Sequence, residues 1–134
     1  MKRKVIVLII AVIMGVLLTA CSKYTSSYKA TILVTTNHSG EASMSFSTFS
    51  GTKVFKIKSG NDENVLKCHA SLSEGSATVY YDYDGTKREL CTLNSGEEFN
   101  ESIDIEANST IYIIVETNGK AEEGRFEFEV DNSK

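Results

Sequence analysis

The sequence predicts an all-β fold: a single antiparallel β-sandwich of about eight or nine short strands that follows a signal peptide. After Ser22, apolar residues recur at every second position and not with the 3.6-residue period of a helix. Turn residues interrupt this alternation about every eight to twelve residues, which is typical of sandwiches. Residues 111–115 are apolar on both faces, as in a central strand that is covered on both sides. These patterns leave a jelly-roll and an immunoglobulin-like strand order open.

Each expected strand has its own apolar face. In chain order, these faces are Tyr28, Ala30, Ile32 and Val34; Ala42, Met44 and Phe46; Phe55 and Ile57; Leu66, Cys68, Ala70 and Leu72; Ala77, Val79, Tyr81 and Tyr83; Phe99, Ile103 and Ile105; and Phe126, Phe128 and Val130. Ser50-Gly51 is expected to separate the second strand from the third. A further short strand is expected over residues 88–93, joined to the strand before it by a hairpin turn at Asp84-Gly85.

The first 21 residues form a secretory signal with three parts: a basic start, an apolar stretch over residues 5–18 and small residues before Cys21. The apolar stretch is shorter than the roughly 20 residues that a membrane-spanning helix needs. Leu18-Thr19-Ala20-Cys21 resembles the lipobox of bacterial lipoproteins. The resemblance implies cleavage before Cys21 and lipidation of its thiol, so that a diacylglyceryl group holds the mature chain to a membrane. Secretion without a lipid is the alternative.

These features divide the chain into a signal peptide over residues 1–20, the lipidated Cys21 with a tether to residue 27, and a sandwich over residues 28–134. By analogy with lipoprotein sorting, Ser22 after the cysteine implies the outer membrane in a two-membrane cell. In a one-membrane cell it implies the outer face of the cytoplasmic membrane. The expected location is therefore the bacterial cell envelope, outside the cytoplasm.

The mature chain is acidic. Without residues 1–20 it has 11 Lys and Arg against 18 Asp and Glu, a formal charge of −7. Because phosphates repel such a chain, this balance excludes a nucleic-acid partner. It also predicts a domain that stands off anionic lipid headgroups.

Cys68 and Cys91 remain as an even pair of cysteines in an oxidising compartment, and we expect a disulfide between them. Two buried thiols are the alternative. A metal site formed by Cys68, His69 and Cys91 is disfavoured, because neighbouring residues of a strand point to opposite faces.

Catalytic machinery is not visible in the sequence. His38 lies in a turn-like segment, His69 has no recognisable partner, and no nucleophile motif or phosphate-binding glycine loop occurs. Asp82-Tyr83-Asp84-Gly85 starts like a calcium loop but lacks its later ligands, so turn formation explains it better. We expect no metal and no cofactor.

Tyr80 and Asp82 are the best candidates for ligand binding. If Val79 and Tyr81 face the core, Tyr80 lies beside Asp82 on the opposite face, where a ring can stack on a sugar and a carboxylate can bind its hydroxyls. Packing of Tyr80 against a neighbouring strand is the alternative.

From Gly75 onward, the order of strands and turns, including Asp84-Gly85, Tyr112 and Gly124-Arg125-Phe126-Glu127-Phe128, is similar to pre-peptidase C-terminal and carbohydrate-binding-module-like domains. This resemblance supports the sandwich and transfers no functional residue. The expected function is a non-catalytic binding or envelope-interaction module with a glycan or an envelope protein as its partner. A structural accessory subunit of a membrane or wall complex is the alternative, and an enzyme is a distant third.

Overall fold

The computed structural model describes residues 24–132, which fold into nine antiparallel strands. The strands are β1 (Ser27–Thr31), β2 (Val34–His38), β3 (Glu41–Lys58), β4 (Glu63–Glu74), β5 (Ala77–Asp82), β6 (Arg88–Leu93), β7 (Glu98–Asp104), β8 (Thr110–Thr117) and β9 (Ala121–Asn132). The predicted signal peptide and Cys21 lie outside these residues. In the described part of the chain, no helix is long and apolar enough to cross a membrane.

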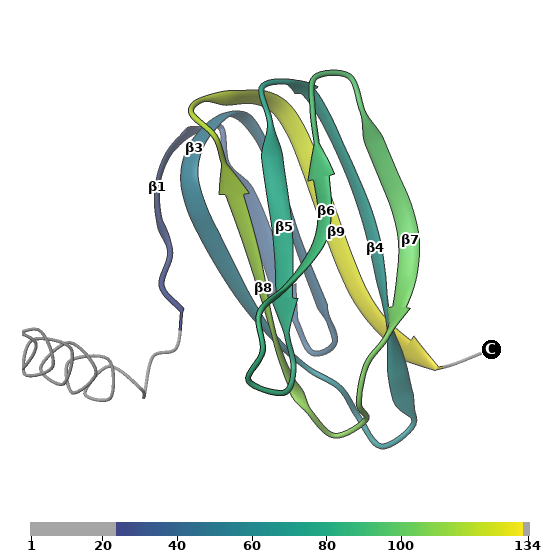
Figure 1. Ribbon diagram of the computed structural model, residues 1–134. Coiled ribbons are helices and arrows are strands. Elements are labelled where there is room, and N and C mark those ends of the chain that lie inside the picture. The colour runs from purple at the N-terminus through teal and green to yellow at the C-terminus, as the bar shows by residue number, and fades with distance from the viewer. Residues whose placement is uncertain (1–23, 133–134) are drawn as a thin grey trace, which may run out of the picture.

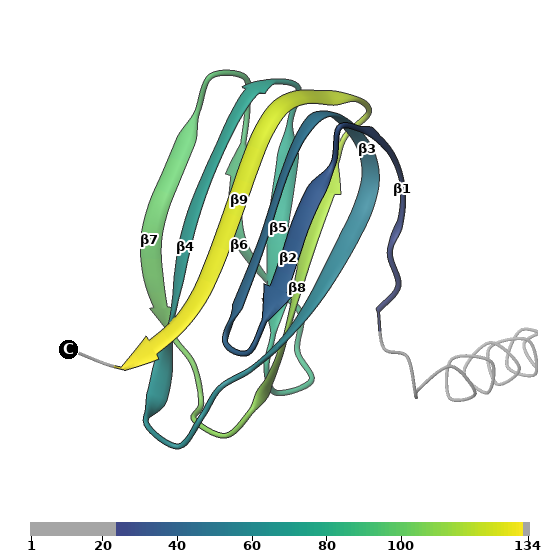
Figure 2. The same ribbon diagram turned by 180° about the vertical axis from the view of Figure 1, so that it is seen from behind.

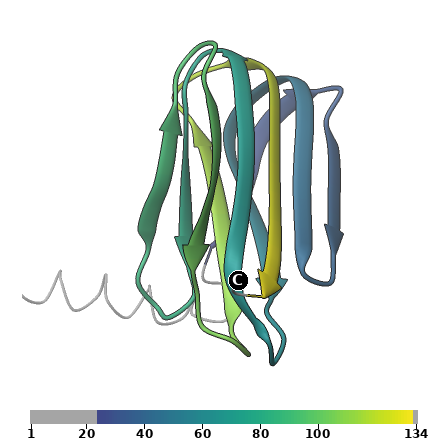
Figure 3. The same cartoon turned by 90° about the vertical axis from the view of Figure 1, so that its right-hand side faces the viewer.

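The strands form a two-layer sandwich, as the sequence predicts (Figures 1 and 3). The hydrogen-bonded order is β6-β5-β8-β3-β9-β4-β7, and β3 takes part in both layers. Its first half pairs with β9, from Glu41 opposite Glu129 to Phe49 opposite Ala121. Its second half pairs with β8, from Thr52 opposite Glu116 to Lys58 opposite Thr110. One layer is therefore β6-β5-β8-β3 and the other is β3-β9-β4-β7, with β2 at the β3 edge of the latter (Figure 2).

The prediction of two strands separated at Ser50-Gly51 is wrong, because β3 runs through this site for 18 residues. Gly51 has a φ of +128°, which other residues rarely adopt. A Cβ atom at this position would lie 2.3 Å from the carbonyl oxygen of Ser27. Glycine thus permits β1 to approach the point where β3 passes from one layer to the other.

The single strand predicted for residues 28–34 is interrupted. Ile32 has a φ of +50°, and this left-handed residue separates β1 from β2. As a result, the expected common apolar face does not form: Ile32 is 79% exposed and Val34 is 58% exposed. Both strands pair with the same edge of β3.

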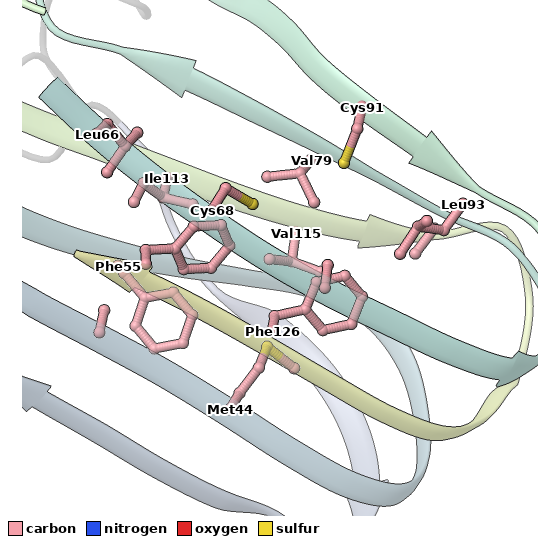
Figure 4. Packing of buried hydrophobic residues seen from close by; sticks show 14 of the residues in the cluster. Met44, Phe55, Leu66, Cys68, Val79, Cys91, Leu93, Ile113, Val115 and Phe126 are labelled. Atoms are coloured by element: carbon pink, nitrogen blue, oxygen red, sulfur yellow. The ribbon is translucent and has the colours of Figure 1, made fainter. Parts of the chain in front are cut away.

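The core lies between the two layers and contains the inward-facing residues of every long strand (Figure 4). Phe46, Phe49 and Phe126 form an aromatic cluster with ring centroids 5.2 and 6.3 Å from the Phe46 ring. The prediction that β8 is central is confirmed, since it lies between β5 and β3. Ile113 faces the core, and Ile114 on the other face is also buried.

Cys68 and Cys91 lie in opposite layers, on β4 and β6, and both are buried free thiols (Figure 4). Their side chains interact across the core, and the contact with Cys91 together with burial raises the pKa of the Cys68 thiol. Sequence reasoning brings the two together through strand pairing, whereas the structure brings them together by packing one layer on the other. The disulfide itself stays a prediction.

Because the two thiols face each other, we expect them to form a disulfide in the oxidising compartment that the signal sequence predicts. The bond closes a loop of about 23 residues, so its loss should lower the free energy of unfolding by about 2–4 kcal/mol. Alkylation without a reductant, followed by mass analysis of the unfolded chain, measures this. Two alkylated cysteines in the exported protein would reject the bond.

Candidate functional site

One outer surface of the sandwich is formed by β2, β3, β9, β4 and β7, and we call it the polar face. It holds three rows of side chains that are in register across the strands. The middle row is Thr36, Ser43, Glu127, His69 and Asn100; the row on one side is Val34, Ser45, Arg125, Ser71 and Glu98; the row on the other is His38, Glu41, Glu129, Lys67 and Ser102. Val34 is the one apolar residue in these three rows. The alternate residues of these strands, such as Met44 and Phe126, face the core.

The polar face is hollowed along its length. A hollow of about 300 Å³ lies over the middle row and is lined by Ser43, His69 and Glu127 among others. A second, of about 210 Å³, shares Ser43 and Glu127 with the first, and a third, of about 500 Å³, shares Ser45 and Arg125 with the second. The three hollows therefore lie next to one another along the polar face, and we call them together the groove. Serines at alternate positions of β3 leave this space because their side chains are small.

The groove carries more acid than base. Glu41, Glu127 and Glu129 line it together with Lys67 and Arg125. The Lys67 ammonium is 2.7 Å from the Asp131 carboxylate, so part of its charge is already balanced within the chain. The net result is a surface of hydroxyl, amide and carboxylate groups that can accept and donate many hydrogen bonds.

A serine, a carboxylate and a histidine lie in one row, but the serine is too far from the histidine to be activated by it as a nucleophile. Ser43 and His69 flank Glu127 from opposite sides, on β3 and β4. They are thus separated by two strand spacings, about 10 Å, whereas proton transfer needs direct hydrogen-bond contact. Within residues 24–132, no group of three or more metal-ligating side chains gathers that could hold a metal ion. The middle row therefore holds no serine and histidine in hydrogen-bond contact.

The residues predicted for ligand binding lie on the other side of the sandwich. Tyr80 and Asp82 point outward from β5, as the alternation predicts, while Val79 belongs to the core. We call this surface the tyrosine face. It consists of Tyr24, Tyr80 and Tyr112, together with Ile114 of β8, which lies opposite Tyr80. Tyr80 is half-buried, and the Lys87 ammonium lies 4.2 Å from the centroid of its ring.

Asp82 is 1% exposed, so the expectation that it binds a ligand hydroxyl is not supported. Its carboxylate accepts hydrogen bonds from the Tyr24 hydroxyl at 2.7 Å, from the Gly85 N–H at 2.7 Å and from the Asp84 N–H at 3.2 Å. Burial and this contact with Asp82 raise the pKa of Tyr24 to about 12. Asp82 therefore holds the β5–β6 turn and the N-terminal segment in place.

Residues 24–26 of the predicted tether contact the sandwich. Tyr24 packs on Tyr112 with ring centroids 5.4 Å apart, and the Ser26 hydroxyl accepts a hydrogen bond from the Val54 N–H. The chain is thus bound to the tyrosine face three residues after Cys21.

Sequence reasoning missed the polar face. Its residues come from five strands, and each appears in the sequence as an ordinary solvent-facing residue. The one local signal is Ser43, Ser45 and Ser47, where three small hydroxyls follow one another at alternate positions of a strand.

No protein-family model and no curated protein sequence matches the chain. Among solved structures, it is similar to TmCBM61 in complex with beta-1,4-galactotriose, with 17% identity, a TM-score of 0.48, and coverage of 81% of this chain and 88% of that chain. It is also similar to tripeptidyl peptidase 2, with 5% identity, a TM-score of 0.51, and coverage of 72% of this chain but 10% of that one.

A third similar structure is the pre-peptidase C-terminal domain of collagenase from Bacillus anthracis, with 12% identity, a TM-score of 0.43, and coverage of 79% of this chain and 89% of that chain. At these identities the likeness concerns the fold alone. No site residue is transferred from these structures.

Proposed function

We propose that the chain is a non-catalytic binding module, anchored through a lipid on Cys21 at an extracytoplasmic membrane surface, and that its ligand lies in the groove of the polar face. The observation that carries this proposal is the set of adjoining hollows over three in-register rows of polar side chains. Hydroxyl, amide and carboxylate groups suit a hydroxyl-rich ligand, and a glycan of the cell envelope is such a ligand.

The proposal assigns binding to Glu127 and His69 in the middle row. Glu127→Gln removes a charged acceptor and keeps the side-chain shape, so affinity for a glycan should fall about tenfold or more. Tyr80→Ala, on the opposite face, should leave affinity unchanged. The experiment is an array screen of the mature chain from Ser22, followed by titration of the wild type, Glu127→Gln, His69→Ala and Tyr80→Ala with the best glycan.

The outcomes separate the two faces. Loss of affinity in Tyr80→Ala alone would move the site to the tyrosine face and reject the groove. Turnover of the glycan would reject a non-catalytic role. Lipidation is tested separately, by mass spectrometry of the N-terminal peptide: Cys21→Ser should abolish processing, and an unmodified Cys21 in the wild-type mature protein would reject the anchor.

One observation favours the accessory-subunit alternative. Three exposed apolar side chains lie at one edge of β3: Tyr28 on β1, Val34 on β2 and Ile32 between the two strands. β2 carries no Lys, Glu, Asp or Pro, the residues that usually protect an edge strand from pairing. A photo-crosslinker at Ile32 that captures one envelope protein, where a crosslinker at Glu98 does not, would support this alternative.

A further inference from the structure

The tyrosine face is the side of the sandwich from which the chain continues toward Cys21. The Tyr24 hydroxyl is bonded to Asp82, and its ring packs on Tyr112. Three residues span at most about 11 Å, so Cys21 is held within that distance of Tyr24. A lipid on the Cys21 thiol would therefore be attached within reach of this face.

The composition of this face suits a membrane surface. Lys56 and Lys58 are exposed on β3, in register with Tyr112 and Thr110, and Lys87 covers Tyr80. Tyrosine and lysine side chains combine an apolar body with a polar tip, and tyrosine is enriched at the membrane–water interface. Of the acids on this side, Asp82 is buried, Glu116 pairs with Lys87 at 3.3 Å, and Glu89, opposite Tyr80 on β6, is exposed. The exposed lysines and acids of this face therefore nearly balance.

The opposite side of the sandwich is more acidic. Glu41, Glu98, Glu127 and Glu129 face outward there, against Lys67 and Arg125. An anionic bilayer repels such a face more strongly than it repels the tyrosine face. Charge and chain path thus point to the same orientation.

We infer that the tyrosine face is a membrane-facing surface, which lies against anionic lipid headgroups when the chain is anchored at Cys21, and that the groove of the polar face is turned away from the bilayer. This inference rests on the anchoring part of the proposed function. It differs from the expectation, drawn from net charge, that the domain stands off the membrane, because the charge is unevenly distributed over the two faces. It also leaves the groove open to ligands in the envelope.

The absence of tryptophan from the chain makes the orientation measurable. Mature chains beginning at Cys21 are coupled through its thiol to a maleimide lipid in phosphatidylglycerol vesicles; Cys68 and Cys91 are buried and protected. Tyr80→Trp places one indole on the tyrosine face, and His69→Trp is the matched probe on the polar face. We expect brominated lipids to quench the Tyr80→Trp fluorescence several-fold more than that of His69→Trp.

Equal quenching of the two probes, or stronger quenching of His69→Trp, would overturn the inference. A second variant combines Tyr80→Trp with three charge reversals, Lys56→Glu, Lys58→Glu and Lys87→Glu. It should lose the stronger quenching of the Tyr80→Trp probe, while the coupled lipid keeps the chain on the vesicle. If the stronger quenching persists unchanged, the lysines have no role and the charge argument fails. Because coupling is chemical, a failure here is distinct from absent lipidation in the cell. A glycan titration on the vesicles that carry Tyr80→Trp, whose groove is unchanged, tests the groove independently.

Discussion

Replacing Asp82 by alanine is expected to lower the free energy of unfolding by about 3 kcal/mol. The Asp82 side chain is buried, and its carboxylate accepts bonds from the Tyr24 hydroxyl and from the backbone N–H groups of Asp84 and Gly85. Alanine removes the acceptor of three donors at once, and it also leaves space where the carboxylate was. Urea unfolding followed by circular dichroism measures the change.

The matched control is Asp84→Ala, in the same turn. Asp84 is exposed, and its carboxylate pairs with Arg88 at 2.9 Å, a surface ion pair worth less than about 1 kcal/mol. If Asp82→Ala costs no more than Asp84→Ala, Asp82 does not hold the turn and the N-terminal segment together. Removal of Asp82 should also release Tyr24, which protease cleavage after Tyr24 would detect.

The same contact predicts a dependence on alkaline pH. The pKa of Tyr24 is raised from 10.0 to about 12, so the folded chain retains the hydroxyl proton more strongly than the unfolded chain. The stabilisation from this bond is therefore complete below pH 10 and is lost as the pH rises through 12. The difference in stability between wild type and Tyr24→Phe should shrink over this interval, whereas a constant difference would contradict the assignment.

Local alternation was enough to predict much of the fold. The inward direction of Val79 and the outward direction of Tyr80 follow from a period of two, and the Asp84-Gly85 turn follows from its residues. The central position of β8 follows from its two apolar faces. These features depend on neighbours in the sequence, so a single sequence is sufficient to find them.

The errors have a common physical origin in backbone geometry and distant pairing. Ile32 has the apolar side chain of a core residue, but its left-handed backbone turns it to solvent. Gly51 is a residue type typical of turns, but here it lies within a continuous strand and leaves room for the close approach of β1. Neither conformation can be read from residue type alone.

The groove was beyond sequence reasoning for a different reason. Ser43, Glu127 and His69 become neighbours through the pairing of β3 with β9 and of β9 with β4. The residues themselves are common on any solvated sheet, and their register is set by strands that lie far apart in the chain. Strand order therefore had to be known before the candidate site could be recognised.

Replacing Gly124 by alanine is expected to lower the free energy of unfolding by about 2 kcal/mol. Gly124 lies opposite Phe46 in the pairing of β3 with β9. A Cβ atom at Gly124 would lie 2.4 Å from the Cζ atom of the Phe46 ring and 2.9 Å from two further ring atoms. The ring has little room to move, because it is 5% exposed and packs beside Phe49 and Phe126.

The control for alanine itself is Gly60→Ala, since a Cβ atom there first meets the flexible Glu63 side chain at 3.2 Å, and the cost should stay within about 0.5 kcal/mol. A double-mutant cycle then identifies the clash. Phe46→Leu alone should be destabilising, but Phe46→Leu with Gly124→Ala should cost less than the sum of the two single changes, by at least about 0.5 kcal/mol. Additive costs would mean that the ring does not rest on Gly124. In that case the backbone conformation at residue 124, and not the Phe46 ring, would be the reason for a glycine there. The aromatic cluster would then not depend on Gly124.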